Sequence, residues 1–427
     1  MSTFYELEYG IPSLINCIGT LTSLGGSRMD ERVTSAIVQA SRSFVDLNEL
    51  QKRAGKRIAD LCRVPDGYTG YVTAGAAAGL CLSTAACMTE NDSTRIRQLP
   101  NTSNISKKYV ILDRGGDMRW NQSIQTSGAQ LLFVGSKKHP ATYSDLLSVL
   151  IDRSHEIACM VYFAGAYDDG QGLSFEDILV LTNSHNIRLI VDASAQLPPR
   201  SNLYKWTHGG ADIVLYSGGK GIGGPQTSGL LLGKSDLVAS VAANGSPHEL
   251  AIGRPMKTSK ESICGLVKAL EIFIQDDDAD DVTHYNLVIS IITDTVCDIP
   301  GISALRVVCP LPPTIQPNTI PRLYIDITVK RNASPPLDHS LKSEFYGDDL
   351  DHGDPLAIQP TTPVNILAYK LLKLQPPIAV NTSNTGIVIN PQTLTVREAK
   401  IVAQGVKHVI ANMVRDGILT AKVTSRL

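Results

Sequence analysis

The chain has 427 residues, which is too long for one ordinary domain and suits two or three domains with a large apolar core. Its 43% hydrophobic and 19% charged residues are typical of a soluble globular protein, and its net charge of -2 gives no overall field that attracts nucleic acid or an anionic membrane. The first ten residues lack the basic and apolar segments of a signal peptide, and no apolar run approaches the roughly 20 residues of a membrane span. Eight scattered cysteines without a CxxC pair then predict a reduced, cytoplasmic protein.

Residues 1–50 are expected to form an N-terminal arm and a helix. The arm contains SLINCIGTLTSLGG, residues 13–26, in which a short apolar strand leads into a Gly-rich turn. The helix is expected to begin at about Asp30.

Residues 51–280 alternate strand-like apolar runs with helical patterns, which predicts a large α/β domain with a mostly parallel sheet. A polar, turn-rich segment at residues 98–108 is expected to be a surface insertion. Helices are expected at residues 76–88 and 142–155. Strands are expected at residues 70–75, 108–113, 130–135, 157–164, 187–194, 211–219 and 229–233.

The acidic run QDDDADD, residues 275–281, is expected to mark the boundary to the next domain. Five Asp residues could suggest calcium, but the alternating ligand positions of an EF-hand loop are absent, so a solvated acidic helix end is the favoured interpretation. Residues 281–427 are predicted to form a smaller α+β domain. Its strands are expected at residues 304–311, 322–330 and 385–390, separated by long Pro-rich connections, and its last helix at residues 395–417.

The stretch ADIVLYSGGKGIGGPQTSG, residues 211–229, places Lys220 among five closely spaced glycines directly after an apolar run. A nucleotide phosphate-binding loop of the GxxxxGK[ST] type is excluded, because Gly221 follows the lysine where that loop needs Ser or Thr. A GxGxxG dinucleotide motif after the first strand is also absent. The simple alternative is a surface lysine in a flexible loop.

Two other features precede this lysine along the chain. Asp192 ends the apolar run IRLIVD, and a carboxylate at the carboxyl end of a buried parallel strand lies where α/β proteins bind ligands; it could instead cap the following segment. Residues 71–88, YVTAGAAAGLCLSTAACM, predict a strand, a turn and a helix of small residues. The first-turn N–H groups of that helix could approach a phosphate ester, although tight packing against the sheet would also explain the small residues.

The three features together predict a site for pyridoxal phosphate. This cofactor needs an amine that bonds it covalently, a carboxylate that keeps its pyridine nitrogen protonated, and a cradle for its phosphate. The turn at residue 75, Asp192 and Lys220 each follow a predicted strand, in this order. The glycines around Lys220 are then explained as leaving room for the ring and the substrate amine.

With these features, the sequence resembles the fold-type I pyridoxal-phosphate enzymes of the selenocysteine synthase (SelA)-like family. This family includes the D-glucosaminate-6-phosphate ammonia-lyase type. The resemblance extends over nearly the whole chain, apart from residues 98–108. It implies an aspartate aminotransferase-like large domain, a smaller α+β C-terminal domain, and a homodimer or higher homo-oligomer with shared active sites. It rests on INCIGTLTSLGGSRM, TAGAAAGLCLSTAACM, VDASAQLPP, ADIVLYSGGKGIGGPQTSGLLLG, IGRPMKTSKESICGLVKALE, DLDHGDPLAI and INPQTLTVREAKIVAQGV.

The resemblance implies roles for individual residues. Lys220 would be the Schiff-base lysine and Asp192 the partner of the pyridinium nitrogen. Ser194 would reach the ring hydroxyl. The cofactor phosphate would be bound by Gly75, Ala76, Ala77 and Ser217, and the phosphate of the neighbouring subunit by Thr227 and Ser228.

Candidate substrate-binding residues lie in two segments. Arg254, Lys257 and Lys260 could bind an anionic substrate group, or they could form a basic helix start that faces solvent. Asn16 and Thr20 on the arm could line the site or merely form a turn.

Three other positions are less informative. No residue near VILDRGGDMRW is an obvious partner to stack on the cofactor ring, so that group stays unassigned. His352 could approach the site from the last domain, although a turn histidine is favoured. His208 has no partners at ligand spacing, and no metal site is predicted.

The resemblance implies Cα deprotonation followed by β-elimination or β-replacement on an amino acid or amino sugar acid. An aminotransferase is the alternative, and a non-catalytic relic that merely binds the cofactor is a third. Selenium transfer to seryl-tRNA is not expected, because the chain shows no additional N-terminal domain and no basic excess. A small-molecule substrate is expected, without nucleic acid or membrane as a partner.

Overall fold

The computed structural model describes residues 4–113, 120–136, 139–165, 172–310, 319–329 and 356–421. These residues form two compact units. Residues 27–276 make the larger unit, whereas the described residues before 27 and after 276 make the smaller one. No helix among the described residues is long and apolar enough to cross a membrane.

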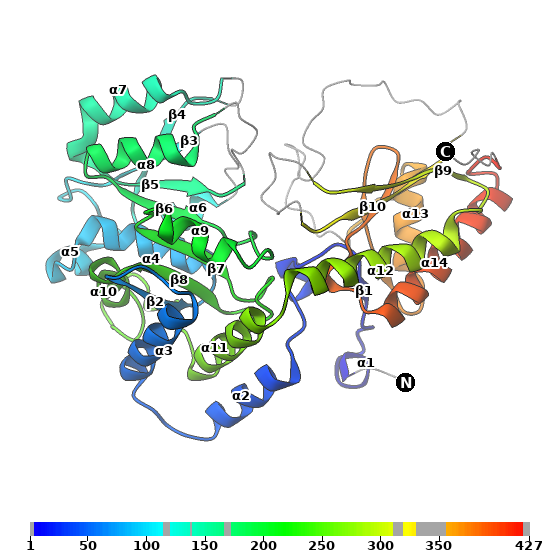
Figure 1. Ribbon diagram of the computed structural model, residues 1–427, viewed down its shortest axis with the longest axis horizontal. Helices are drawn as coiled ribbons and strands as arrows, with labels where there is room; N and C mark the ends of the chain where they lie inside the picture. Colours follow the sequence, from blue (N-terminus) through cyan, green and yellow to red (C-terminus); the bar gives the residue numbers. More distant parts are fainter. Residues whose placement is uncertain are drawn as a thin grey trace. The chain divides into compact units, whose positions relative to one another are not determined.

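A seven-stranded sheet in the order β2-β8-β7-β6-β5-β3-β4 forms the centre of the larger unit (Figure 1). Every strand expected in this region is confirmed. The ladder from β7 to β4 is parallel, and β8 runs antiparallel to both of its neighbours, so the prediction of a mostly parallel sheet is also confirmed. The strands are β2 Tyr68–Thr73, β3 Tyr109–Asp113, β4 Gln130–Val134, β5 Ile157–Phe163, β6 Arg188–Asp192, β7 Ile213–Ser217 and β8 Gly229–Lys234.

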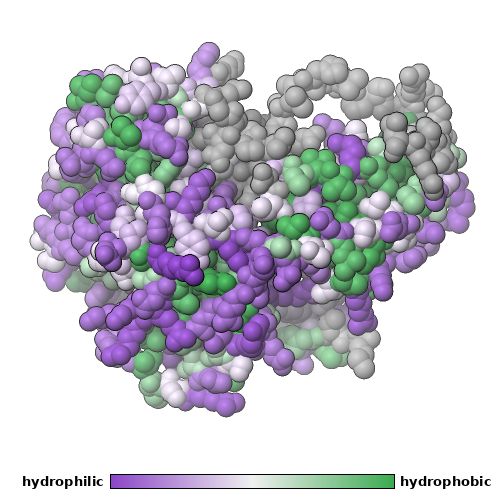
Figure 2. Space-filling view, viewed as in Figure 1, coloured by the Kyte–Doolittle hydropathy of each residue, from purple (hydrophilic) through white to green (hydrophobic). Residues whose placement is uncertain are grey.

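Helices pack around this sheet, and the visible face of the larger unit is mostly hydrophilic (Figure 2). The strands are apolar because both of their faces are covered; every residue of β5 is buried. The helices are α2 Glu31–Ser41, α3 Leu47–Leu61, α4 Ala76–Thr89, α5 Ser93–Gln98, α6 Asn121–Gln125, α7 Tyr143–Arg153, α8 Phe175–Ser184, α9 Asn202–His208, α10 Ser235–Asn244 and α11 Lys260–Gln275.

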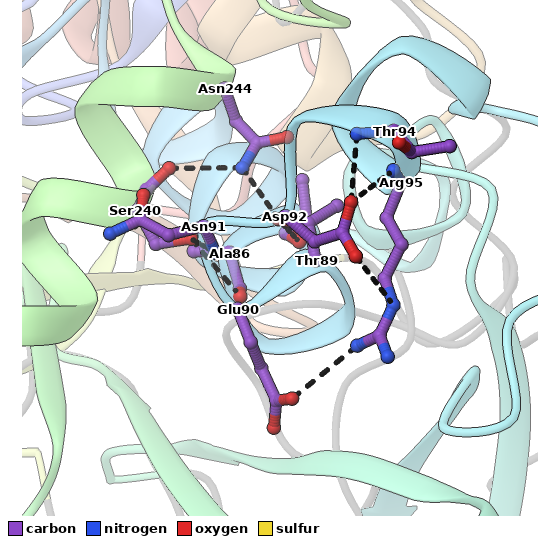
Figure 3. A network of polar contacts seen from close by, with 10 residues as sticks. Ala86, Thr89, Glu90, Asn91, Asp92, Thr94, Arg95, Ser240 and Asn244 are labelled. Carbon is purple, nitrogen blue, oxygen red and sulfur yellow. Dashed lines mark hydrogen bonds and ion pairs between the residues drawn. The ribbon is translucent and has the colours of Figure 1, made fainter.

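The carboxyl end of α4 is fixed by α10 (Figure 3). Asn244 Nδ2 donates to Thr89 Oγ1 at 2.8 Å and to the Ser240 carbonyl at 2.9 Å. Ser240 Oγ donates to the Ala86 carbonyl at 3.3 Å and accepts from the Asn91 N–H at 3.2 Å. Because Ser240 and Asn244 are buried, these bonds are shielded from water. They hold one end of a rigid helix whose other end lies at the candidate site.

Residues 98–108 differ in part from the expected surface insertion. Leu99, Thr102 and Ile105 are buried, and Thr102 Oγ1 donates to the Gly128 carbonyl at 3.1 Å. A side chain at residue 128 would overlap the Pro100 carbonyl, so the segment is packed onto the turn before β4. The polar composition of the segment does not reveal this packing, because the three buried side chains are separated by polar residues.

The smaller unit contains a four-stranded antiparallel sheet in the order β12-β13-β10-β9 and a short parallel pair, β1 with β11. The acidic run begins α12, with Asp277 as its N-cap, which confirms the helix-end interpretation. The strands are β1 Ile15–Asn16, β9 Ile302–Val308, β10 Arg322–Ile327, β11 Ile378–Ala379, β12 Asn381–Thr382 and β13 Gly386–Ile389. The helices are α1 Phe4–Tyr9, α12 Asp278–Val296, α13 Pro363–Leu372 and α14 Val396–Arg415.

Candidate functional site

The candidate site is built at the carboxyl ends of strands β5, β6 and β7. Asp192 ends β6, where it pairs in parallel register with Phe163, the last residue of β5, and with Leu215 of β7. Ser217 ends β7. Carboxyl ends of parallel strands meet at one edge of a sheet, which is the edge where open α/β sheets bind ligands.

Asp192 is a buried carboxylate with a cation nearby. Its Oδ1 accepts a hydrogen bond from the Ser194 N–H at 2.9 Å, and only 7% of the residue is exposed. Burial raises the pKa of Asp192 above its ordinary value, and the hydrogen bonds from Ser194 and the positive charge of Lys220 offset part of this effect. The Ser194 backbone thus contacts Asp192 directly, and the charge of Lys220 acts on the same carboxylate.

Lys220 lies in a turn that hydrogen bonds hold in place. The Gly218 N–H donates to the Ser228 carbonyl at 2.9 Å, and the Gly223 N–H donates to the Lys220 carbonyl at 3.0 Å. The lysine itself is half-buried. These contacts favour a defined position for the lysine over the alternative of a flexible surface loop.

The structure gives a different reason for the glycines around Lys220. A Cβ at residue 219 would lie 2.5 Å from Gln226 Cα, and a Cβ at residue 221 would overlap the Leu197 carbonyl. Both neighbours are backbone atoms, which cannot move aside as the end of a long side chain can. The glycines thus allow the turn to close on the chain itself.

The amino end of α4 is open to an anion. Gly75 is the N-cap, with φ of +117°, and no side-chain cap bonds to the helix. Nothing lies within 4 Å of the point where a Cβ on Gly75 would stand. The N–H groups of Ala76 and Ala77 have no acceptor within the helix, since the first four amides of any α-helix lack one. A phosphate fits this position, because the helix dipole and these donors both favour negative charge.

The small residues of α4 also serve packing, as the alternative interpretation held. A Cβ on Gly79 would lie 2.8 Å from Leu215 Cδ2 of β7. Residues 79–89 are buried throughout, whereas Ala77 is exposed. The helix therefore packs tightly on the sheet with most of its length and leaves only its first turn accessible.

The structure separates the other predicted phosphate-binding residues. Thr227 is exposed, and its Oγ1 lies 3.4 Å from Ser262 Oγ. Ser228 is fully buried, and its hydroxyl donates to the Pro225 carbonyl at 2.6 Å within the turn. Ser228 thus stabilises the Lys220 turn, and only Thr227 remains accessible to a second molecule.

The three basic candidates differ in their availability. Lys260 Nζ donates to the Ala40 carbonyl at 2.7 Å and pairs with Glu261, so it holds the start of α11. Arg254 is half-buried and Lys257 is exposed.

The two candidates on the arm belong to the smaller unit. Asn16 makes a turn: its Oδ1 accepts from the Ile18 N–H at 2.9 Å, and its Nδ2 donates to the Gly19 carbonyl at 2.8 Å. Thr20 is buried. For Asn16 the structure thus supports the alternative of turn formation.

Three further positions were considered from the sequence. His208 Nε2 lies 2.8 Å from the Arg63 carbonyl, and the described residues contain no group of three or more side chains that could hold a metal ion. His352 and residues 114–119 of the VILDRGGDMRW stretch lie outside the described residues. Trp120, at the end of that stretch, packs on Phe163 with ring centroids 5.7 Å apart.

We predict that Asp192→Asn stabilises the cofactor-free protein at pH 7. The pKa of Asp192 is higher in the folded state than in the unfolded state. The protonated carboxyl group therefore costs nothing below the unfolded pKa, and the folded protein loses stability as pH rises through the folded pKa and the group ionises. Urea unfolding at pH 7 should give the variant a higher free energy of unfolding than wild type, and the gap should shrink toward pH 4. Asp236→Asn, at an exposed carboxylate, is the control. If Asp192→Asn were less stable than wild type at pH 7, the claim that burial destabilises the ionised carboxylate would be contradicted.

Comparison with known proteins places these features in a family. The family model described as L-seryl-tRNA selenium transferase (SelA) matches residues 14–299. D-glucosaminate-6-phosphate ammonia lyase from Salmonella typhimurium is 31% identical over 63% of this chain and 69% of its own length. A 5'-C-glycyluridine monooxygenase-decarboxylase from a Streptomyces species is 29% identical over 62% of this chain and 65% of its own length.

Solved structures agree on the fold. A structure of D-glucosaminate-6-phosphate ammonia-lyase superimposes with a TM-score of 0.74 at 23% identity, covering 96% of this chain and 99% of that one. A chain of the SepCysS–SepCysE N-terminal domain complex gives a TM-score of 0.52 at 11% identity, over 92% of this chain and 95% of its own. The fold is therefore that of fold-type I pyridoxal-phosphate enzymes, as expected. Since the family model covers more than half of its residues, the chain belongs to the SelA family.

Proposed function

We propose that this chain is a pyridoxal-phosphate-dependent enzyme that deprotonates Cα of an amino acid or amino sugar acid and then eliminates or replaces a group on Cβ. The observation that carries the proposal is the buried carboxylate of Asp192 at the end of β6, on which the positive charge of Lys220, in the turn after β7, acts. The similarity to an ammonia lyase at 31% identity supports elimination as the reaction type.

The residues at the sheet edge match what this cofactor requires. Lys220 Nζ is the point of covalent attachment, and Asp192 is the partner of the pyridine nitrogen. Ser194 is assigned to the ring hydroxyl. The phosphate is assigned to the uncapped start of α4, with Gly75, Ala76 and Ala77, and to Ser217; Thr227 is assigned to the phosphate of a neighbouring subunit.

Burial of Asp192 is favourable only with a cationic partner. The desolvation that raises its pKa makes the isolated carboxylate costly in the folded protein. Asp192 would hold the protonated ring nitrogen of the cofactor, which would lower that cost and keep the ring proton in place. The same burial therefore destabilises the empty protein and strengthens binding of a cationic ring.

Pyridoxal phosphate, when bound, supplies an electron sink for the electron pair released at the substrate Cα. Lys220 Nζ would hold the cofactor and, with substrate bound, would be the general base that accepts the Cα proton. A leaving group on Cβ then departs with its bonding electron pair. Water completes a lyase reaction, which yields ammonia and a keto acid, and another nucleophile completes a replacement.

An anionic substrate group is assigned to Arg254 and Lys257. The half-buried guanidinium of Arg254 can make paired hydrogen bonds to a carboxylate or phosphate, whereas the exposed Lys257 acts as a point charge. Asn16 and Thr20 of the arm belong to the smaller unit and are weaker candidates for binding substrate. Selenium transfer to seryl-tRNA is not proposed, because a net charge of -2 provides no broad basic surface.

The cytoplasm is the proposed location. All eight cysteines are free thiols, and five of them are buried. Such thiols persist in a reducing compartment.

The activity test compares wild type with Lys220→Ala and with Lys205→Ala, an exposed lysine of the same unit. With pyridoxal phosphate and a panel of amino acids and amino sugar acids, wild type and Lys205→Ala should release ammonia over many turnovers. Lys220→Ala should lose at least a thousandfold in kcat, because it lacks both the attachment point and the base. A single turnover per site by wild type would indicate an aminotransferase and contradict elimination. Equal rates in all three proteins would contradict the role of Lys220.

We also propose a homodimer or higher homo-oligomer with shared active sites. Both units expose large apolar side chains, which cost free energy in water unless another surface covers them. In the larger unit Phe44 is fully exposed next to the half-exposed Val45. In the smaller unit Phe4, Tyr5 and Tyr9 of α1 are more than half exposed.

Light scattering should give wild type at least twice the single-chain mass of 46.0 kDa. Phe44→Ser should raise the dissociation constant of the assembly at least tenfold, about 1.4 kcal/mol, because it removes a large apolar contact. Val180→Ser, at a 59% exposed valine of α8, is the matched control and should change nothing. A wild type that stays at single-chain mass at micromolar concentration would contradict the oligomer.

A further inference from the structure

Ser27 makes two hydrogen bonds to the residue before Lys220. Its N–H and its Oγ both donate to the Gly219 carbonyl, each at 2.9 Å. The two residues are 192 positions apart in the sequence. Ser27 lies in the GGSRM stretch, to which the proposed function assigns no role.

These bonds fix the peptide that carries the Lys220 amide. Within the turn, the Lys220 N–H approaches the Ser217 carbonyl at 3.4 Å, and the Lys220 carbonyl accepts from the Gly223 N–H at 3.0 Å. The first of these is at the long limit of a hydrogen bond, so it restrains the lysine weakly. The carbonyl of residue 219 is held more firmly, by two donors from outside the turn. Since backbone angles set the direction of a side chain, the position of Ser27 influences where Lys220 Nζ points.

The chain before Ser27 turns at two consecutive glycines. Gly25 and Gly26 have φ values of +88° and +76°, in the left-handed region that favours glycine. The Gly26 N–H donates to the Leu21 carbonyl at 2.8 Å, and the Gly25 N–H donates to the Thr22 carbonyl at 3.1 Å, so the turn itself is defined. Gly26 ends the N-terminal segment of the smaller unit, and Ser27 is the first residue of the larger unit. The anchor on Gly219 therefore fixes the point where the chain enters the larger unit.

We propose that Ser27 is a positioning residue, which orients Lys220 through the Gly219 carbonyl. The proposal rests on the proposed function, because it takes Lys220 as the attachment point and the base. Without the hydroxyl, the peptide between residues 219 and 220 keeps only the N–H donor of Ser27 and can rotate. A displacement of about 1 Å in a reacting group can cost roughly a hundredfold in rate, so loss of one of two bonds should cost less.

Three variants of the full chain test the proposal. Ser27→Ala removes the hydroxyl and keeps the N–H, and Ser27→Thr keeps a hydroxyl in the same place. Ser41→Ala is the matched control, because Ser41 Oγ also donates to a carbonyl, that of Val38 at 2.8 Å, on the exposed end of α2. Each protein is titrated with pyridoxal phosphate by visible absorbance, and kcat and KM are measured separately.

Ser27→Ala should weaken apparent cofactor affinity about fivefold, since a net hydrogen bond is worth about 1 kcal/mol. It should lower kcat about tenfold with KM within about twofold, because the base rather than substrate binding is displaced. Ser27→Thr should restore both values, and Ser41→Ala should match wild type.

Unchanged affinity and kcat in Ser27→Ala would overturn the inference alone, as would a loss in both that Ser27→Thr fails to restore. Absence of any visible band from wild type with pyridoxal phosphate would instead overturn the proposed function, and the inference with it. The two failures are therefore distinguishable.

Discussion

The burial of the Asp192 carboxylate is the constraint on which the rest of the site depends. Asp192 is removed from water at the end of β6, where its charge is costly, and the nearby charge of Lys220 offsets only part of that cost. A bound cationic ligand would offset the remaining cost. The parallel ladder explains how the site is built, because register pairing places Asp192 beside Phe163 and Leu215 at one edge.

The Lys220 turn and the start of α4 differ in how tightly they are packed. The Lys220 turn is filled by its own chain, so that side chains at residues 219 and 221 would collide with backbone atoms. The start of α4 is left empty around Gly75, while the rest of that helix is packed against the sheet and α10. The Lys220 turn and the open anion position thus lie on elements that cannot easily shift.

Sequence patterns predict the strands of the large sheet well, because a strand is a local feature of the chain. A buried parallel strand appears in the sequence as a short apolar run. The residue at its carboxyl end, such as Asp192, is then the next one along the chain. The Lys220 turn was located for the same reason, although its glycines were explained by room for a ligand rather than by backbone packing. The side chain of Asn16 forms a local turn, which one residue type does not distinguish from a ligand contact.

Contacts between distant segments are what the sequence could not show. The bonds of Ser27 to Gly219 and of Lys260 to Ala40 join residues far apart in the chain, and neither has a composition signal. The buried anchors of residues 98–108 depend on the turn at Gly128, which a polar, turn-rich stretch does not reveal. Each of these requires the folded backbone, since hydrogen-bond partners are selected by position rather than by residue type.

The most direct test of the account is to locate the cofactor chemically. The protein is incubated with pyridoxal phosphate, reduced with borohydride, digested, and analysed by peptide mass spectrometry. The account predicts a stoichiometric phosphopyridoxyl label on Lys220, and a strongly reduced yield in Asp192→Ala. A label spread over exposed lysines, or absent from the peptide that contains Lys220, would contradict the central claim.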